Sequence, residues 1–207
     1  MSDMPPVSAD PLPREFYNRS ALTVARELLG ARLMRAEPGQ PPLIGIIVET
    51  EAYTGHQDMA SHGRLKKTPR NLPMWGTPGH AYVYLTQGLH WMFNVVVEAE
   101  GEPAAVLIRA VRPVEGHAVI ASRRSKVQKP REWTSGPGRL TMAFGIDKSF
   151  NTADLTTPDA GLWIEAGEPV AHPHVIASPR IGMGKTPEPW FSMPWRWYVA
   201  DEEYVSR

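Results

Sequence analysis

The 207-residue sequence contains no cysteine. This absence excludes disulfide bonds, thiolate metal sites and a cysteine nucleophile. No segment reaches the roughly 20 apolar residues that a membrane helix needs. The first residues are acidic and rich in proline, which is not the basic-then-apolar order of a signal peptide. We therefore expect a soluble protein of the cytoplasm that has no contact with a membrane.

The sequence also lacks net charge, because 22 basic residues balance 22 acidic ones. Neutrality by itself favours a small-molecule enzyme or a binding module over a nucleic-acid binder. The charges are nevertheless segregated, since segment 61–70 holds four cations and no acid, and segment 109–139 holds eight cations and two acids. The cations are Arg64, Lys66, Lys67, Arg70, Arg109, Arg112, Arg123, Arg124, Lys126, Lys129, Arg131 and Arg139. This distribution fits a protein with one phosphate-facing side, and the alternative is a set of ordinary solvated charges.

The length and composition predict one globular domain with few long helices, since one core accommodates about 250 residues and the chain has 21 prolines. Residues 1–13 are predicted to be a mobile N-terminal arm, and residues 14–207 the single domain. We expect an α+β fold in which helices flank a mostly antiparallel, curved sheet.

Hydrophobic periodicity predicts the individual elements. Apolar residues from Leu22 to Leu29 recur at helical spacing, with Ser20 as a candidate N-cap and Gly30 after the end. Two further helices are expected at 114–125, which is basic, and at 137–144, which begins with proline. The predicted strands are 31–36, 43–53, 80–86, 91–98, 104–111, 162–166, 174–178 and 195–200.

Candidate site residues occur at strand ends and in alternating pairs. Glu49, Glu51 and Tyr53 share one face of a predicted strand, so one or both carboxylates would line a pocket, and the alternative is a strand end in solvent. Tyr82 and Tyr84 also share a face, which indicates an exposed or ligand-facing surface. These residue types suit an enzyme that acts on a base taken out of the DNA stack.

Single polar residues interrupt or end other apolar runs. Asn94 lies inside one apolar strand and Arg109 ends another, so each needs a polar partner or a ligand. His62 lies in a predicted loop, and a metal site with Asp58 and His56 is the weaker interpretation because no compact ligand pattern accompanies them.

Two glycine-bearing turns, SGPGRL at 135–140 and RIGMG at 180–184, could bring backbone N–H groups up to phosphates, although neither is a P-loop or a dinucleotide fingerprint. Three tryptophans near the C-terminus are interpreted as core and rim residues rather than a stacking platform. They are Trp190, Trp195 and Trp197.

Several of these segments occur in one order that resembles the alkyladenine (3-methyladenine) DNA glycosylase family. They are VETEAY, the stretch from His62 to TPRN, PGHAYVYLTQG, MFN, LIRAVRP, SGPGRL with GIDKSFN, and RIGMG. Each motif alone is weak, and the ordered set is specific. The resemblance extends from LLGARL to WRWYV, which is nearly the whole chain after the predicted arm.

The resemblance implies a monofunctional glycosylase of base excision repair that flips an alkylated purine and hydrolyses its bond to the sugar. The implied substrates are 3-methyladenine and 7-methylguanine. Ethenoadenine and hypoxanthine are further candidates, but they are neutral and need a proton from elsewhere. Glu51 would be the general base, and Arg109 and the main-chain carbonyl of Ile181 would hold the water with it. The implied partner is double-stranded DNA that contains damaged bases, and no metal or organic cofactor is implied. The protein would be nucleoid-associated if prokaryotic, and we expect a monomer because no apolar surface stripe is evident.

The resemblance also implies how the base is recognised. Tyr53 and Tyr84 would stack on its faces, His62 would contact an edge, and Asn94 would crowd the 2-amino group of guanine. Gln87 occupies the position where family members carry a tyrosine that intercalates into DNA. We therefore expect Gln87 to fill the gap left by the flipped base less well, with looser binding to DNA. No lysine or terminal amine occupies a Schiff-base position, so strand cleavage is not expected. The alternatives are a damage-binding protein without catalysis and a purine nucleosidase.

Overall fold

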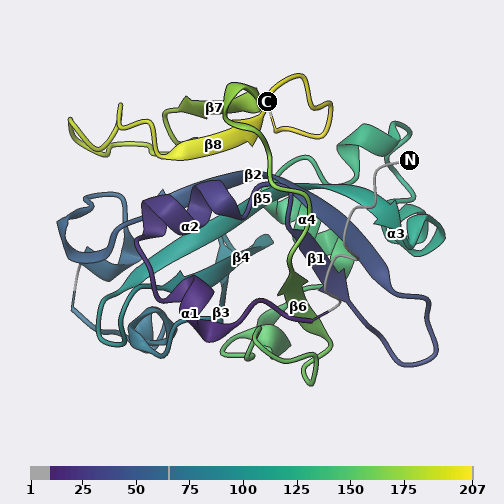
Figure 1. Ribbon diagram of the computed structural model, residues 1–207, viewed down its shortest axis with the longest axis horizontal. Coiled ribbons are helices and arrows are strands. Elements are labelled where there is room, and N and C mark those ends of the chain that lie inside the picture. Colours follow the sequence, from purple (N-terminus) through teal and green to yellow (C-terminus); the bar gives the residue numbers. More distant parts are fainter. Residues whose placement is uncertain (1–9, 65, 207) are drawn as a thin grey trace.

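An antiparallel sheet of eight strands forms the framework of the computed structural model, which describes residues 10–64 and 66–206 (Figure 1). The strand order is β3-β4-β5-β2-β1-β6, and β8 joins β7 to β2. The strands are β1 (Arg32–Arg35), β2 (Leu43–Tyr53), β3 (Ala81–Thr86), β4 (His90–Val97), β5 (Ala104–Glu115), β6 (Leu162–Glu165), β7 (Val175–Ser178) and β8 (Arg196–Val199). The predicted α+β class with an antiparallel sheet is confirmed.

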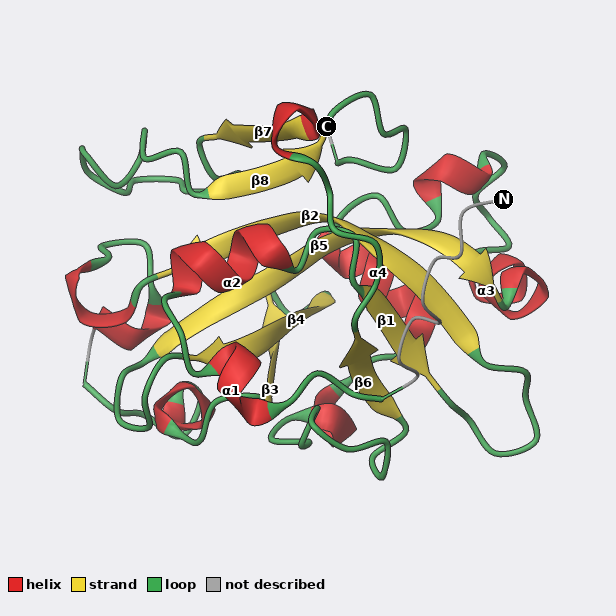
Figure 2. Cartoon of the chain, viewed as in Figure 1, coloured by secondary structure: helices red, strands yellow, loops and turns green. Residues whose placement is uncertain are grey.

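Four α-helices and several short 3-10 turns surround this sheet in the described part of the chain (Figure 2). The helices are α1 (Arg14–Tyr17), α2 (Ala21–Glu27), α3 (His117–Arg123) and α4 (Pro137–Phe144). Helix α2 crosses β2 and β5, and α4 packs against β4 and β5. The 3-10 turns are η1 (Gly55–Gln57), η2 (His62–Arg64), η3 (Leu72–Trp75), η4 (Pro130–Glu132), η5 (Lys148–Phe150) and η6 (His172–His174).

Strand β2 is the centre of the sheet because it pairs with three other strands. One edge follows β5 along most of its length, while the other edge pairs first with β1 and then, at residues 49–51, with β8. Close packing beside this strand requires a glycine. A Cβ atom on Gly45 would lie 2.7 Å from Val111 and 2.9 Å from Phe144, so any larger residue would push these core side chains apart.

The two-residue alternation of the strands separates an apolar face from a polar one. Val83, Phe93, Val106 and Ile108 belong to the main hydrophobic core together with residues of α2. On the same side the Thr50 hydroxyl donates a hydrogen bond to the Ala25 carbonyl of α2 at 2.7 Å. The intervening residues of these strands therefore point to the opposite face, where the polar and aromatic side chains lie.

The helix predicted at 114–125 begins later than expected. Strand β5 continues to Glu115, and Gly116, with a φ of 79°, turns the chain into α3, which begins at His117. The predicted helix at 22–29 corresponds to α2, and α4 has the predicted bounds. Ser20 occupies the N-cap position of α2, but its side chain makes no capping hydrogen bond.

Residues 1–9 of the predicted arm lie outside the described residues, whereas its last residues are placed. The Leu12 N–H donates to the Ile164 carbonyl at 2.7 Å, and Pro11 forms a bridge with Glu165 of β6. Leu12 is also part of the core. The fold therefore begins before Arg14, the predicted boundary. Across the described ranges, no helix has the length and apolar character needed to cross a membrane.

Candidate active site

A cavity of about 420 Å³ opens on the polar face of the sheet. All eight predicted site residues line it: Glu51, Tyr53, His62, Tyr84, Gln87, Asn94, Arg109 and Ile181. Its further lining residues include Met74, Tyr82, Met92, Pro137 and Met183. A larger cavity of about 630 Å³ beside α1 and α2 is lined mainly by apolar side chains, and none of the predicted site residues lines it. The smaller cavity is therefore the candidate active site.

Strand register explains how distant residues meet in this cavity. Tyr82 pairs with Asn94, Asn94 with Leu107, and Leu107 with Glu51, so these four side chains form one row across β3, β4, β5 and β2. Directly opposed residues in antiparallel strands place their side chains on the same face. Strand pairing thus places the two alternating tyrosines and Glu51 in one wall of the cavity.

The Glu51 carboxylate is fully buried in this wall and is held by three donors. The Ile181 N–H donates to Oε1 at 2.7 Å, the Tyr53 hydroxyl donates to Oε2 at 2.9 Å, and Nη1 of Arg109 lies 3.1 Å from Oε1. Charge-assisted hydrogen bonds of this kind are short and directional. They fix the orientation of the carboxylate at the cavity.

Arg109 bridges the two glutamates of β2. Its Nε donates to Glu49 at 2.8 Å, its Nη1 faces Glu51, and its Nη2 donates to the Ser206 hydroxyl at 3.0 Å. Burial alone would lower the pKa of Arg109, but Glu51 and Glu49 outweigh burial and raise its pKa above the ordinary value. Arg109 is therefore a fixed positive charge beside the Glu51 carboxylate.

Glu49 lies behind this pair in a network that the sequence did not reveal. It accepts hydrogen bonds from Arg196 at 2.6 Å and from the N–H and hydroxyl of Ser206 at 2.7 and 2.8 Å. Burial would raise the pKa of Glu49, but Arg109, Arg196 and the Ser206 N–H together hold it below the ordinary value. Glu49 thus supports Arg109 rather than lining the cavity.

Aromatic rings form the wall beside Glu51. The rings of His62 and Tyr84 are edge-to-face with centroids 4.7 Å apart, and the rings of Tyr82 and Tyr84 are 5.2 Å apart. Nδ1 of His62 lies 3.0 Å from the Tyr82 hydroxyl. Burial, aided by the positive charge of Arg70, lowers the pKa of His62. The neutral form of the imidazole is therefore favoured.

Hydrogen bonds to the main chain orient two amides at or near the cavity. The Asn94 side chain is buried in β4 and donates to the Tyr82 carbonyl at 3.0 Å. Asn71 donates to the His62 carbonyl at 2.9 Å and so holds the turn that carries His62. Asn71 is the last residue of the TPRN motif. This motif therefore helps to hold the turn of His62, a structural role that the sequence did not indicate.

Gln87 lies in the β3–β4 hairpin turn at the cavity. Gln87 and Gly88 both have positive φ values, 50° and 69°, and the Leu89 N–H donates to the Thr86 carbonyl at 3.0 Å. Positive φ at both central positions is typical of the tight turns that join hairpin strands. The turn places Gln87 in the lining of the cavity. It leaves Leu89 72% exposed.

Charged residues whose surroundings the sequence left open have partners in the structure. Asp58 is paired with Arg180 at 2.5 Å, and no group of three or more metal-ligating side chains occurs in the part of the chain that the structure describes. In the basic segment 109–139, fewer cations are available to contact phosphates than the charge count suggests. Arg109 is buried at the cavity, and Arg112 and Arg123 pair with Glu202 and Glu37.

A buried carboxylate, an adjacent arginine and aromatic walls around a base-sized cavity define a hydrolase site for a planar group. The family profile described as methylpurine-DNA glycosylase (MPG) matches residues 15–203. The chain therefore belongs to the methylpurine-DNA glycosylase family, and it is a DNA glycosylase, a hydrolase of DNA repair. This confirms the family resemblance that the ordered motifs indicate.

Similar proteins match over almost their full length. A protein of Methanocella arvoryzae is 44% identical over 95% of this chain and 96% of its own. Proteins of Carboxydothermus hydrogenoformans and Myxococcus xanthus are each 46% identical over 95% of this chain, and over 98% and 93% of their own. All three carry the name "Putative 3-methyladenine DNA glycosylase".

Proposed function

We propose that this protein is a monofunctional glycosylase that flips 3-methyladenine or 7-methylguanine out of duplex DNA and releases the base, leaving an abasic site. The observation that carries the proposal is the buried Glu51 carboxylate, held by three donors in the wall of a cavity large enough for one base. An enzyme that acts on a base in a duplex needs such a pocket because the reacting bond is otherwise inaccessible.

Glu51 accepts a proton from the water that attacks C1′ of the flipped nucleotide. The C1′–N bond breaks as the new C1′–O bond forms, and the bonding electrons leave with the purine. Positive charge develops on the sugar in the transition state, and an ionised carboxylate stabilises it. Arg109 and the main-chain carbonyl of Ile181 hold the water together with Glu51 in this proposal.

Selection of the lesion follows from charge and shape. Tyr53 and Tyr84 present aromatic faces, which attract cationic alkylated purines by cation–π and stacking interactions. A cationic purine leaves as a neutral base without further protonation. Ethenoadenine and hypoxanthine are neutral and need a proton, so we expect slower release of these lesions. Asn94 crowds the 2-amino group of guanine.

The basic segment 61–70 adjoins the cavity and is the proposed phosphate contact. The Arg70 guanidinium lies 5.1 Å from the centroid of the Tyr84 ring, and Arg64, Lys66 and Lys67 are exposed nearby in sequence. We propose that the enzyme acts as a monomer on duplex DNA and that its affinity falls with salt. No lysine occurs among the described cavity residues, so the proposed reaction ends at base release without strand cleavage.

Gln87→Tyr should tighten binding to damaged duplex by about 1 kcal/mol, roughly a fivefold lower Kd, because a tyrosine stacks on neighbouring bases better than an amide does. Fluorescence anisotropy at fixed salt measures Kd. Gln40→Tyr, in the exposed β1–β2 loop, is the matched control. Equal affinity and equal lesion range for Gln87→Tyr and wild type would show that intercalation by residue 87 does not limit binding in this protein.

The function is tested by single-turnover release of base from duplexes that carry 3-methyladenine, 7-methylguanine, ethenoadenine or hypoxanthine. We expect the two methylated purines to be released fastest, with abasic sites as products and intact strands before alkali. Salt-sensitive binding without release would favour a damage-binding protein. Release from free nucleosides without affinity for DNA would favour a nucleosidase.

A further inference from the structure

A fully buried ion pair lies next to the active site and has no part in the proposed chemistry. Nη1 of Arg180 lies 2.5 Å from Oδ2 of Asp58, and Nη2 lies 2.9 Å from Oδ1. Neither side chain has any exposed surface. The Asp58 carboxylate also accepts the N–H groups of Thr54 at 3.3 Å and Ala60 at 2.9 Å. The bidentate geometry and these added bonds allow only one orientation of the arginine.

Arg180 contacts the strand that carries the catalytic glutamate. Its Nη1 donates to the carbonyl of Ala52, the residue between Glu51 and Tyr53, at 2.9 Å. Its guanidinium lies 4.7 Å from the centroid of the Tyr53 ring and 5.0 Å from that of Trp195. Tyr53 lines the cavity, whereas Arg180 is not among its lining residues. The planar guanidinium therefore supports the Tyr53 ring from outside the cavity.

Arg180 also anchors the segment that binds Glu51 directly. The next residue, Ile181, donates its N–H to Glu51 at 2.7 Å, although its side chain is 39% exposed. Gly182 and Gly184 follow with positive φ values and have no atoms within 4 Å of an added Cβ. Since Gly182 and Gly184 have little packing of their own, the buried Arg180 side chain helps to hold the chain next to the Ile181 N–H.

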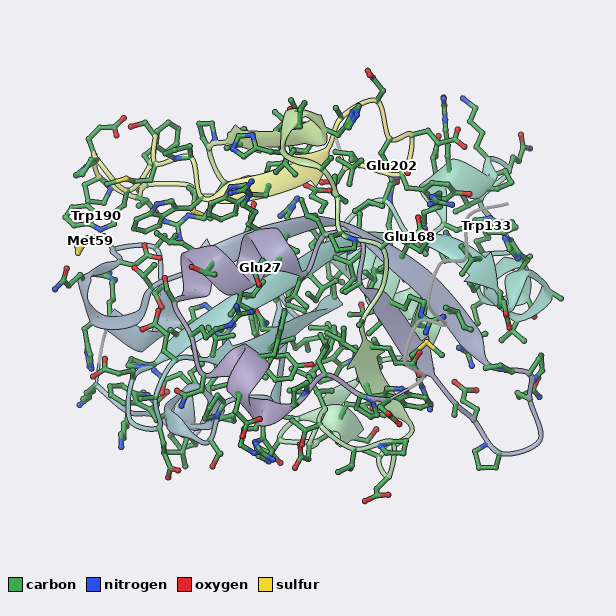
Figure 3. All side chains as sticks on the ribbon, in the orientation of Figure 1. Glu27, Met59, Trp133, Glu168, Trp190 and Glu202 are labelled. Carbon is green, nitrogen blue, oxygen red and sulfur yellow. The ribbon has the colours of Figure 1, made fainter. Side chains whose placement is uncertain are left out.

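Two other loops are joined by the same side chain. Arg180 Nη2 lies 3.3 Å from the Trp190 carbonyl while it pairs with Asp58. Figure 3 shows Met59, which follows Asp58, and Trp190 at the same end of the molecule. The arginine thus ties the 58–60 turn and the loop before β8 to the end of β2.

We propose that Arg180, held by Asp58, is a positioning residue of the active site that sets both the Tyr53 ring and the Ile181 N–H against Glu51. This inference rests on the proposed role of Glu51. Arg180 touches neither the base nor the reacting atoms. It acts through two of the three groups that contact the carboxylate, and small displacements of such groups reduce rates strongly.

Arg180→Lys keeps the positive charge but removes the planar fork, so it tests positioning directly. We expect the single-turnover rate on 7-methylguanine duplex to fall by about 10- to 100-fold. The Kd for the same duplex should stay within about threefold, because DNA contacts are retained. The loss should therefore fall on the rate at saturating enzyme and not on Kd, because displacement of the Ile181 N–H and the Tyr53 ring affects Glu51 and leaves the phosphate contacts in place.

Arg32→Lys is the matched control, because Arg32 pairs at 2.8 Å with the buried Glu165 on β1 and β6, away from the cavity. Its rate and its Kd should equal those of wild type. Asp58→Asn, which retains shape but not charge, is the second variant. It should reproduce the slower rate with an unchanged Kd if Arg180→Lys does not fold.

Wild-type rates in Arg180→Lys or Asp58→Asn would overturn the positioning role. A slower rate that is matched by an equal loss of folded, DNA-binding protein would also overturn it. If wild type releases no base from any lesion, the proposed function itself fails and this inference fails with it. That result is distinct from a wild type that releases base at the same rate as the variants.

Discussion

Replacing Glu51 with Gln is expected to lower the single-turnover rate of base release by about 10²- to 10⁴-fold, the usual contribution of a positioned general base. Glutamine has nearly the same shape, and its carbonyl can still accept the Ile181 N–H that lies 2.7 Å from the carboxylate. It cannot take a proton from water, and it removes the negative charge that stabilises positive charge on the sugar. Quench-flow measurement of released base gives the rate.

Binding separates this catalytic loss from a folding defect. Anisotropy with lesion-containing duplex should give a Kd for Glu51→Gln within about threefold of wild type, because the phosphate contacts are unchanged. Glu115→Gln, at the exposed end of β5, is the charge-matched control and should release base at the wild-type rate. A Glu51→Gln enzyme that binds and still releases methylated purines at the normal rate would remove Glu51 from the mechanism.

Glu49→Gln is expected to lower the free energy of unfolding at pH 7 by about 3 kcal/mol, since breaking a buried ion pair leaves the partner charges uncompensated. Here two arginines, Arg109 and Arg196, lose their shared anion. Base release should also slow, because Arg109 loses the contact that fixes it beside Glu51. Urea unfolding with a common slope measures the stability change.

The stability difference should depend on pH in a defined direction. The pKa of Glu49 is lower in the folded protein than its ordinary value of 4.5. Its contribution is therefore complete above about pH 4.5 and is lost as the pH falls through the lower folded pKa. The free energies of unfolding of wild type and Glu49→Gln should therefore become equal at acidic pH. The control Glu115→Gln should have the wild-type free energy of unfolding at pH 7. A difference that stayed constant from neutral to acidic pH would contradict this assignment.

Some of the site was predictable because it depends on local periodicity. Alternation placed Glu51 with Tyr53, and Tyr82 with Tyr84, on common faces, and each pair does share a face. Asn94 and Arg109 stood out because polar residues inside or at the end of apolar strands need partners, and both line the cavity. The ordered motifs then indicated the family, which the comparison confirms.

The sequence by itself determined the strands, their faces and the family, since these depend on residues close together in the chain or on short motifs. Only the tertiary structure decided which charges pair. Asp58 and Arg180 are 122 positions apart, and Glu49 and Ser206 are 157 apart. Such partners share no periodic pattern in the sequence. The local sequence around an acidic residue also does not indicate whether its carboxylate faces water or a buried arginine. The physical reason is that ion pairing and burial depend on distances in space, which strand register and loop packing set.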